Sequence, residues 1–337
     1  MTETSSGSPG GLALPVLDRA LEERLRARMA VVEQRLEETV RSEAPFITEA
    51  CRHLLAAGGK RFRPLLVLLA AEAGDPARDE VVTAACVVEL THLASLYHDD
   101  VMDEAMMRRG ADSANARWDN HVAILAGDWL FSRSSSLTAE LGAEAVGIQA
   151  ETFRRLVEGQ ILETLSAVDG HDPLEHYLRV VEGKTGSLIA TSARYGAMFA
   201  GASDEVVAAL TEYGEKVGIA FQLSDDLLDI GSESDESGKT PGTDLREGVP
   251  TLPVLYAMRS TDPDDRRLQD LASRPLSDDT EHAEALALLR AHPAMGEARA
   301  YVQGLADDAK ALLGVLPDGP AKDALVAFAD LIATRTA

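Results

Sequence analysis

The chain has 337 residues, of which 45% are hydrophobic, and it carries 32 basic against 56 acidic side chains, a formal net charge of −24. So negative a surface repels nucleic acid and anionic membranes, which excludes both as general partners, and a polyanionic ligand would need a local basic cluster. The hydrophobic content is enough for a large core, and the low aromatic content of 4% favours an all-α fold over a sheet.

The predicted elements are helices along almost the whole chain. Residues 1–14 form a polar tail that is predicted to be disordered, and residues 15–337 are predicted to fold as a single all-α domain. In chain order, helices are predicted over residues 15–42, 46–57, 64–74, 79–104, 121–141, 144–168, 173–199 with an interruption near Gly183, 204–230, from Pro250 onward, and as three or four shorter helices within 264–335. Residues 232–249 are predicted to form a mobile loop, and the sequence lacks the Asn-Gly signals that mark β-hairpins.

Cysteine usage and hydropathy bear on the compartment. Cys51 and Cys86 lack metal-ligand spacing and are predicted to be reduced, buried thiols. The apolar runs fall short of the roughly 18 residues that a membrane-spanning helix needs, and the N-terminal segment has no apolar signal-peptide core. We therefore expect a cytoplasmic protein without a transmembrane segment.

One acidic pattern, D-D-x-x-D, occurs twice, at Asp99–Asp103 and at Asp225–Asp229. Each copy ends an apolar helical segment, and residues four apart share a helix face, so the outer aspartates of each copy lie together. One such pattern alone is typical of a solvated helix end. Two copies on apolar helices, where unpaired carboxylates are costly, indicate bound cations. Hard carboxylate oxygens with room left for substrate phosphates favour Mg²⁺.

Basic residues gather near these motifs. A flexible Gly58-Gly59 pair precedes three cations in four residues at a predicted helix start, where anions are favoured: Lys60, Arg61 and Arg63. Arg108 and Arg109 follow the first motif, and His92 lies seven residues before Asp99 on nearly the same helix face. Further hydrogen-bond donors are Lys184, Thr185, Gln222 and Lys239. Each alone is compatible with an ordinary loop, salt bridge or core residue, whereas their combination indicates a diphosphate site.

Together these motifs resemble the all-trans polyprenyl diphosphate synthases, the head-to-tail isoprenyl chain elongases. In the family's order they are GGKRFRP, ELTHLASLYHDDVMDEAMMRRG, GD at 127–128, EGQ at 158–160, KTG at 184–186, GIAFQLSDDLLDI and GKTPGTDLREGVPTLP. The resemblance runs from about residue 45 to 260. It departs from the family's pattern at Val249, where many members carry a basic residue, so one cation for the diphosphate is missing.

The resemblance implies the isoprenoid synthase fold, an antiparallel helix bundle around a deep central cavity, and a homodimer. It implies a prenyltransferase that condenses an allylic diphosphate, such as farnesyl or geranylgeranyl diphosphate, with isopentenyl diphosphate by Mg²⁺-assisted ionisation. Two or three Mg²⁺ ions would bind at the aspartates Asp99, Asp100, Asp103, Asp225, Asp226 and Asp229. Isopentenyl diphosphate would be held by Lys60, Arg63, His92 and Arg109, and the allylic diphosphate by Arg108, Lys184, Thr185, Gln222 and Lys239. The catalytic set would be Asp99, Asp103, Asp225, Arg108 and Lys184.

Product length is predicted from the helix that carries the first motif. Ala94 and Ser95, one turn before Asp99, are small, whereas an aromatic residue there would stop elongation early, so we expect an all-trans product of C30 or longer. A plug from another helix, at Met106, Phe131 or Phe153, would shorten it.

Other functions remain open at this point. They are a short-chain (C15–C20) synthase, a class I terpene cyclase, a non-catalytic regulatory subunit of a heteromeric synthase, and a structural Ca²⁺-binding helical protein. The basic cluster argues against the cyclase and the Ca²⁺-binding protein, and the six retained aspartates argue against the regulatory subunit.

Overall fold

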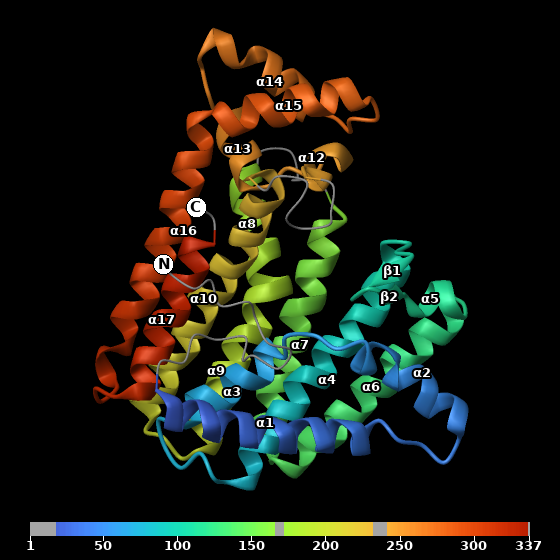
Figure 1. Cartoon of the computed structure of the whole chain (residues 1–337), viewed down its shortest axis with the longest axis vertical. Helices are drawn as coiled ribbons and strands as arrows, with labels where there is room; N and C mark the ends of the chain where they lie inside the picture. Colours follow the sequence, from blue (N-terminus) through green and yellow to red (C-terminus); the bar gives the residue numbers. More distant parts are fainter. Residues whose placement is uncertain (1–17, 166–171, 232–240, 336–337) are drawn as a thin grey trace, which may run out of the picture. The chain divides into compact units, whose positions relative to one another are not determined.

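The structure is a computed structural model that describes residues 18–165, 172–231 and 241–335 (Figure 1). These residues are α-helical almost throughout, which confirms the predicted all-α class. They form two compact units: unit 1 comprises the chain up to Glu151 with Thr191–Thr211 and Val315–Ala327, and unit 2 comprises Thr152–Ala190, Glu212–Gly314 and the chain from Phe328. The predicted single domain, central cavity and antiparallel arrangement stay predictions, and the predicted disordered tail lies outside the described residues.

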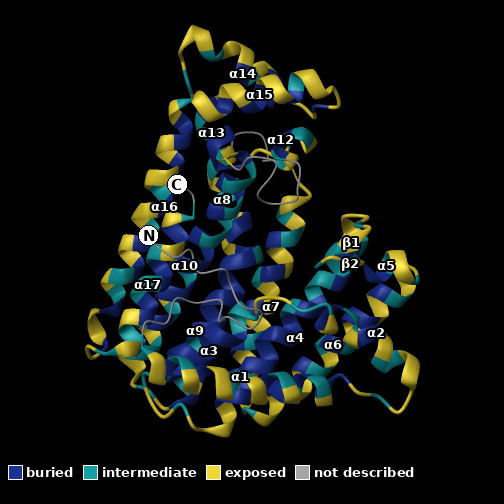
Figure 2. Cartoon of the chain, viewed as in Figure 1, coloured by how far each residue is buried: buried dark blue, intermediate teal, exposed yellow. Residues whose placement is uncertain are grey.

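Unit 1 is built around two buried helices. Its elements are α1 (Arg19–Thr39), α2 (Pro45–Ala56), α3 (Phe62–Ala71), α4 (Asp79–Met102), α5 (Ala114–Arg117), α6 (Asn120–Glu140) and the first part of α7 (Ala143–Glu163), with parts of α9, α10 and α17. Residues 64–71 of α3 and 81–91 of α4 are all buried, so both ribbons are largely dark blue in Figure 2. Helix α4 packs along α3 and α6. Side chains cap several helices, as where Asp18 accepts from the backbone N–H of Leu21 at 2.7 Å.

Helix α4 is the one helix in the described ranges that is long and apolar enough to cross a membrane. An 18-residue window in it has a mean hydropathy of 1.3, but 78% of that window is buried inside the protein. The core helix of a protein can be equally long and apolar, so the length and hydropathy of α4 are weak evidence for a membrane-spanning helix. The thiols of Cys51 and Cys86 are buried too, as predicted, and burial raises the pKa of each to about 12.

A short β-hairpin follows α4, which the sequence analysis did not predict. Strands β1 (Met107–Arg108) and β2 (Ala111–Asp112) pair antiparallel, with Arg108 opposite Ala111. The two loop residues, Arg109 (φ 55°) and Gly110 (φ 76°), both have positive φ, as two-residue hairpin turns of type I′ require. The turn was missed because arginine, rather than asparagine or aspartate, occupies its first position.

Unit 2 contains the remaining helices. They are α8 (Pro173–Val181), the π-helical turn η1 (Glu182–Gly186), α9 (Ser187–Phe199), α10 (Asp204–Gly231), α12 (Thr243–Glu247), α13 (Leu252–Met258), the 3₁₀ turns η2 (Pro263–Asp265) and η3 (Leu313–Val315), α14 (Arg266–Ala272), α15 (Asp279–Ala291), α16 (Pro293–Leu312) and α17 (Pro320–Thr334). Helices α7, α9, α10 and α17 each have residues in both units. Helices α14–α17 confirm the predicted shorter helices within 264–335. The interruption predicted near Gly183 is the π-helical turn.

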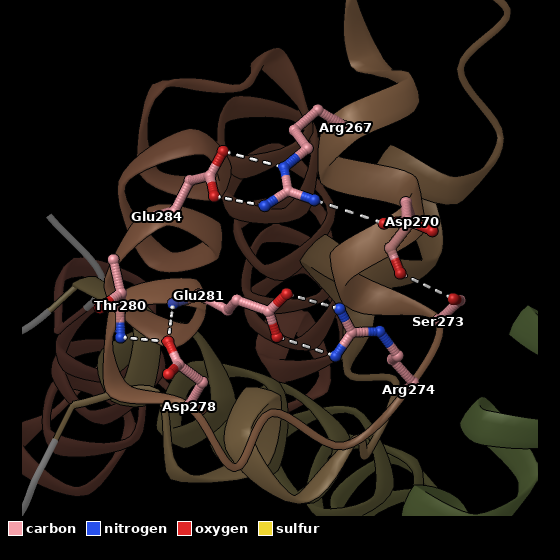
Figure 3. A network of polar contacts seen from close by, with 8 residues as sticks. All are labelled: Arg267, Asp270, Ser273, Arg274, Asp278, Thr280, Glu281 and Glu284. Carbon is pink, nitrogen blue, oxygen red and sulfur yellow. Dashed lines mark hydrogen bonds and ion pairs between the residues drawn. The ribbon is translucent and has the colours of Figure 1, made fainter.

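Surface ion pairs join α14 and the loop that follows it to α15 (Figure 3). Arg267 donates two hydrogen bonds to Glu284, at 2.9 and 2.6 Å, and Arg274 donates two to Glu281, at 3.0 and 2.9 Å. Asp278 caps α15 by accepting from the backbone N–H groups of its first turn. Exposed ion pairs contribute only about 0–1 kcal/mol each to the free energy of unfolding. They therefore orient α14 against α15 rather than decide the stability of unit 2.

Candidate functional site

The first acidic motif lies at the C-terminal end of α4, where the helix emerges from the core of unit 1. Asp99 is partly exposed and Asp103, at the C-cap position, is exposed, so both carboxylates lie on an open stripe of the helix with Ser95 and His92. Residues at these spacings share one helix face. The predicted pairing of Asp99 with Asp103 on one face therefore agrees with the helix geometry.

Asp100 points the other way and is fully buried. Its Oδ1 accepts a hydrogen bond from Nε of Arg108 at 2.6 Å, and its Oδ2 has no hydrogen-bond partner among the described residues. Burial raises the pKa of Asp100, and the Arg108 guanidinium opposes that shift. Arg108 also lies 3.9 Å from Asp103, so it bridges the buried and exposed carboxylates of the motif.

The hairpin turn delivers Arg109 to the loop that ends α2. Its Nη1 donates to the carbonyl oxygens of Leu54 at 3.0 Å and Gly58 at 2.5 Å. A Cβ on Gly59 would lie 2.8 Å from Cζ of Arg109, so the second glycine of the Gly-Gly pair makes room for this guanidinium. The Gly-Gly pair thus serves packing as well as flexibility.

Two arginines at the start of α3 differ in their partners. Arg61 pairs with Glu33 at 2.6 Å and with the buried Glu89 at 3.1 Å. Arg63 has a buried Nε without a hydrogen-bond partner in the described part of the chain, and burial, only partly offset by Glu89, lowers its pKa to about 10. Lys60 is exposed. An arginine with a buried Nε and no hydrogen-bonded carboxylate among the described residues is suited to receive an anion.

His92 lies among these cations. Burial, followed by the charges of four arginines, lowers its pKa well below the ordinary value, so the imidazole is neutral at pH 7; the four are Arg63, Arg109, Arg108 and Arg61. Arg63, Arg108 and Arg109, which are far apart in sequence, thus all lie near enough to act on His92; that these residues bind a diphosphate stays a prediction. Glu89 was not predicted, because nothing in the local pattern marks it; its buried carboxylate pairs with Arg61 and only partly offsets the positive charge of the cluster.

The second acidic motif lies in the last two turns of α10, in unit 2. Asp225 accepts a hydrogen bond from Nη2 of Arg335 at 2.7 Å, and the same guanidinium lies over the ring of Phe221, 5.0 Å from its centroid. Asp229 Oδ2 accepts from the backbone N–H of Asp244 at 3.2 Å. Arg335 was missed because it follows Asp225 by 110 residues and belongs to no motif.

The middle aspartate of this motif is buried in a network of side chains. Asp226 accepts from the hydroxyl of Tyr177 and from Nε2 of Gln222, the latter at 3.0 Å, and Oε1 of Gln222 accepts from Oγ1 of Thr185 at 3.0 Å. Burial raises the pKa of Asp226 to about 6. The two oxygens of Asp226 thus face protein donors, unlike the open carboxylate of Asp103.

Lys184 is carried by the π-helical turn that packs closely against α7. Its Nζ lies 2.6 Å from Oε2 of Glu163. A Cβ on Gly159 would lie 2.5 Å from the backbone nitrogen of Lys184, and one on Gly183 would lie 2.7 Å from the carbonyl oxygen of Arg155. Glycine at both positions therefore brings the Lys184-Thr185 backbone against α7. Lys239, the remaining predicted allylic-site cation, lies outside the described residues.

The carboxylates suit a divalent cation that also binds substrate. Within the residues that the structure describes, no three acidic, histidine or cysteine side chains form a ready-made metal cage. Mg²⁺ is commonly held by one or two carboxylates together with substrate phosphates, and the side of α4 that carries Asp99 and Asp103 fits that use.

The chain is similar to known proteins over most of its length. A family model described as Polyprenyl synthetase matches residues 44–289. A nonaprenyl diphosphate synthase of Mycobacterium tuberculosis is 52% identical over 312 residues, which cover 92% of this chain and 93% of that protein.

Two solved structures share the fold. A geranylgeranyl pyrophosphate synthase from Corynebacterium glutamicum, complexed with calcium and isoprenyl diphosphate, has a TM-score of 0.88 at 46% identity and covers 96% of this chain and 99% of its own. A decaprenyl diphosphate synthase from Rhodobacter capsulatus has a TM-score of 0.86 at 37% identity, with coverages of 94% and 99%.

Proposed function

The chain belongs to the polyprenyl synthetase family, and we propose that it condenses an allylic diphosphate with isopentenyl diphosphate to give an all-trans polyprenyl diphosphate of C30 or longer. The observation that carries this proposal is the arrangement of unit 1: the partly exposed Asp99 and the exposed Asp103 belong to the same helix as His92, whose pKa is lowered by burial and by four nearby arginines. That combination suits one cation-bound diphosphate and one diphosphate held directly by arginine.

The residues divide into two sets by chemistry. Mg²⁺, which we propose binds at Asp99, Asp103 and Asp225 with Asp100 and Asp229 in support, would neutralise the leaving diphosphate as the allylic C–O bond ionises. Arg108, Lys184 and Thr185, with Gln222 and Lys239, are proposed to hold that diphosphate.

A second set is proposed to hold isopentenyl diphosphate: Lys60, Arg63, His92 and Arg109. Arg63 and Arg109 offer guanidinium groups that match phosphate oxygens, and the neutral His92 can donate a hydrogen bond without adding charge. The calcium and isoprenyl diphosphate named for the Corynebacterium structure support both the cation and the substrate class.

The direct test is a chain-length assay of the purified protein. It is incubated with Mg²⁺, farnesyl diphosphate and excess labelled isopentenyl diphosphate, and the products are separated by length. We expect consumption of isopentenyl diphosphate and products of C30 or longer. Failure to consume it would contradict the reaction class and favour a cyclase or a regulatory subunit.

A short-chain synthase is the second candidate, because a geranylgeranyl pyrophosphate synthase is among the similar structures, at 46% identity. The same assay separates the two, since products no longer than C20 would establish the short-chain function and end the long-chain proposal.

Ser95→Phe is expected to shorten the product, because Ser95 lies on the open stripe of α4 one turn before Asp99. Among the described residues its hydroxyl donates to the carbonyl oxygen of His92, in the same helix. Ala94→Phe is the matched variant. Ala94 is completely buried against α6, with its carbonyl oxygen 3.1 Å from where a Cβ on Gly127 would lie.

The extra ring at Ala94 should therefore overpack the core and lower stability by about 1–3 kcal/mol. Product lengths and thermal unfolding midpoints are measured for both variants. An unchanged product from folded Ser95→Phe would show that this stripe does not limit chain length.

We further propose a homodimer in the cytoplasm. The exposed apolar side chains Ile124 and Leu125 of α6, with 42% and 66% of their surface accessible, suit a contact between copies, and the burial of α4 suits a protein without a membrane anchor. Leu125→Glu is expected to shift the mass measured by light scattering toward the monomer. An unchanged dimer would place the interface elsewhere, and a monomeric wild-type protein would contradict the proposal.

A further inference from the structure

Tyr177 of α8 connects two helices of unit 2. Its hydroxyl donates a hydrogen bond to Oδ2 of Asp226 in α10. The residue lies 49 positions before Asp226 and outside every motif from which the site was predicted. Its hydroxyl is therefore placed by tertiary packing directly behind the second acidic motif.

The hydrogen-bond chain continues from Asp226 to two residues proposed to hold the allylic diphosphate. Asp226 Oδ1 accepts from Nε2 of Gln222 at 3.0 Å, which fixes the amide group in one orientation. The opposite end of that amide, Oε1, accepts from Oγ1 of Thr185 at 3.0 Å. The order of the chain is Tyr177, Asp226, Gln222 and Thr185.

We propose that Tyr177 is a positioning residue for the allylic diphosphate, acting through Asp226 on Gln222 and Thr185; this rests on the proposed function. Asp226 is then an anchor for Gln222 rather than a ligand of the cation. The members of this motif that can face a cation are then Asp225 and Asp229, which are partly exposed.

The physical reason is the burial of Asp226, whose side chain is almost inaccessible to solvent. A buried carboxylate keeps its position only while its oxygens are hydrogen-bonded. Loss of the Tyr177 hydroxyl leaves Oδ2 of Asp226 without that donor, and the carboxylate is expected to rotate toward a different hydrogen-bond donor. Gln222 then loses its fixed orientation, although no atom that touches substrate has been removed.

Tyr177→Phe tests the proposal, with Tyr195→Phe as a matched control. Tyr195 is also buried, and its hydroxyl donates to the carbonyl oxygen of Ala145 at 2.8 Å, in unit 1 and apart from the proposed site. Tyr177→Phe is expected to raise KM for farnesyl diphosphate about tenfold and to leave KM for isopentenyl diphosphate within about twofold. Tyr195→Phe should lower the unfolding midpoint without changing either KM.

A double-mutant cycle with Gln222→Ala shows whether the effect passes through the network. In the Gln222→Ala background, Tyr177→Phe should change KM for farnesyl diphosphate by less than about twofold, because the residue that it positions is absent. Should Tyr177→Phe fail to fold, Asp226→Asn in the same cycle takes its place, with the same tenfold rise in KM expected.

An unchanged KM for the folded single variant, equal rises in both KM values, or multiplicative effects in the cycle would each overturn the proposal. Wild-type protein that does not consume isopentenyl diphosphate would instead contradict the proposed function. The two failures are therefore distinguishable.

Discussion

Asp103→Asn is expected to lower kcat by about 10²- to 10³-fold, whereas Glu104→Gln, at the next residue, should change it by less than about twofold. Each substitution replaces an exposed carboxylate by an amide of nearly the same shape. Only Asp103 shares the open face of α4 with Asp99, so only its loss removes a negative oxygen from the proposed cation site. Comparing the two variants distinguishes a direct cation ligand from a residue that contributes only to the negative charge of the surface.

The measurement is kcat at saturating concentrations of both substrates over a Mg²⁺ titration. Asp103→Asn should also need more Mg²⁺ for half-maximal rate. Equal losses in the two variants would mean that the surrounding field, rather than ligation, is responsible. Full activity of Asp103→Asn would remove this residue from the site.

Arg63→Gln is expected to raise KM for isopentenyl diphosphate by about 100-fold, since a charge-assisted and partly buried contact to phosphate is lost. Most substitutions of partly buried residues lower stability, whereas Arg63→Gln is expected not to. The lowered pKa of Arg63 shows that the folded protein holds this charge at a cost below pH 10, so the variant should unfold at the same temperature as wild type or higher.

Arg61→Gln is the matched control, two residues earlier. Arg61 is already paired with Glu33 and Glu89, so its loss leaves the buried Glu89 without that partner and should lower the unfolding midpoint. Thermal unfolding with and without pyrophosphate gives a readout independent of catalysis, because pyrophosphate should stabilise wild type more than Arg63→Gln. Arg63→Gln protein that is destabilised, yet unchanged in KM, would show that Arg63 serves the fold alone.

The acidic motifs could be predicted because their evidence is local. Aspartates four apart at the end of an apolar segment indicate both the helix and the shared face, and α4 and α10 end within a few residues of the predicted positions. The basic cluster was predictable in part, since Arg63 follows the Gly58-Gly59 pair by four residues and Arg109 directly precedes Gly110. Whether the two motifs face each other stays a prediction.

The partners of these residues were not predictable for a physical reason. Tyr177 reaches Asp226 and Arg335 reaches Asp225 over separations of 49 and 110 residues, which only the tertiary packing of unit 2 decides. Periodicity identifies the buried face of a helix without identifying what it meets. The pattern therefore gave Asp226 the same role as its neighbours, although its burial and its donors differ.

The π-helical turn of Glu182–Gly186 limits how the chain can vary in length. In an α-helix, residues three apart lie on one face, whereas the wider π-helical turn points them further apart. Gly183 can thereby meet Gly159 of α7, where a Cβ on Gly183 would lie 3.0 Å from Cα of Gly159. Gly186 meets Gly218 of α10, where a Cβ on Gly218 would lie 2.9 Å from Cα of Gly186. Deleting one residue here would restore an ordinary helix and break one of these contacts. The number of residues in this segment is thus as constrained as their identity.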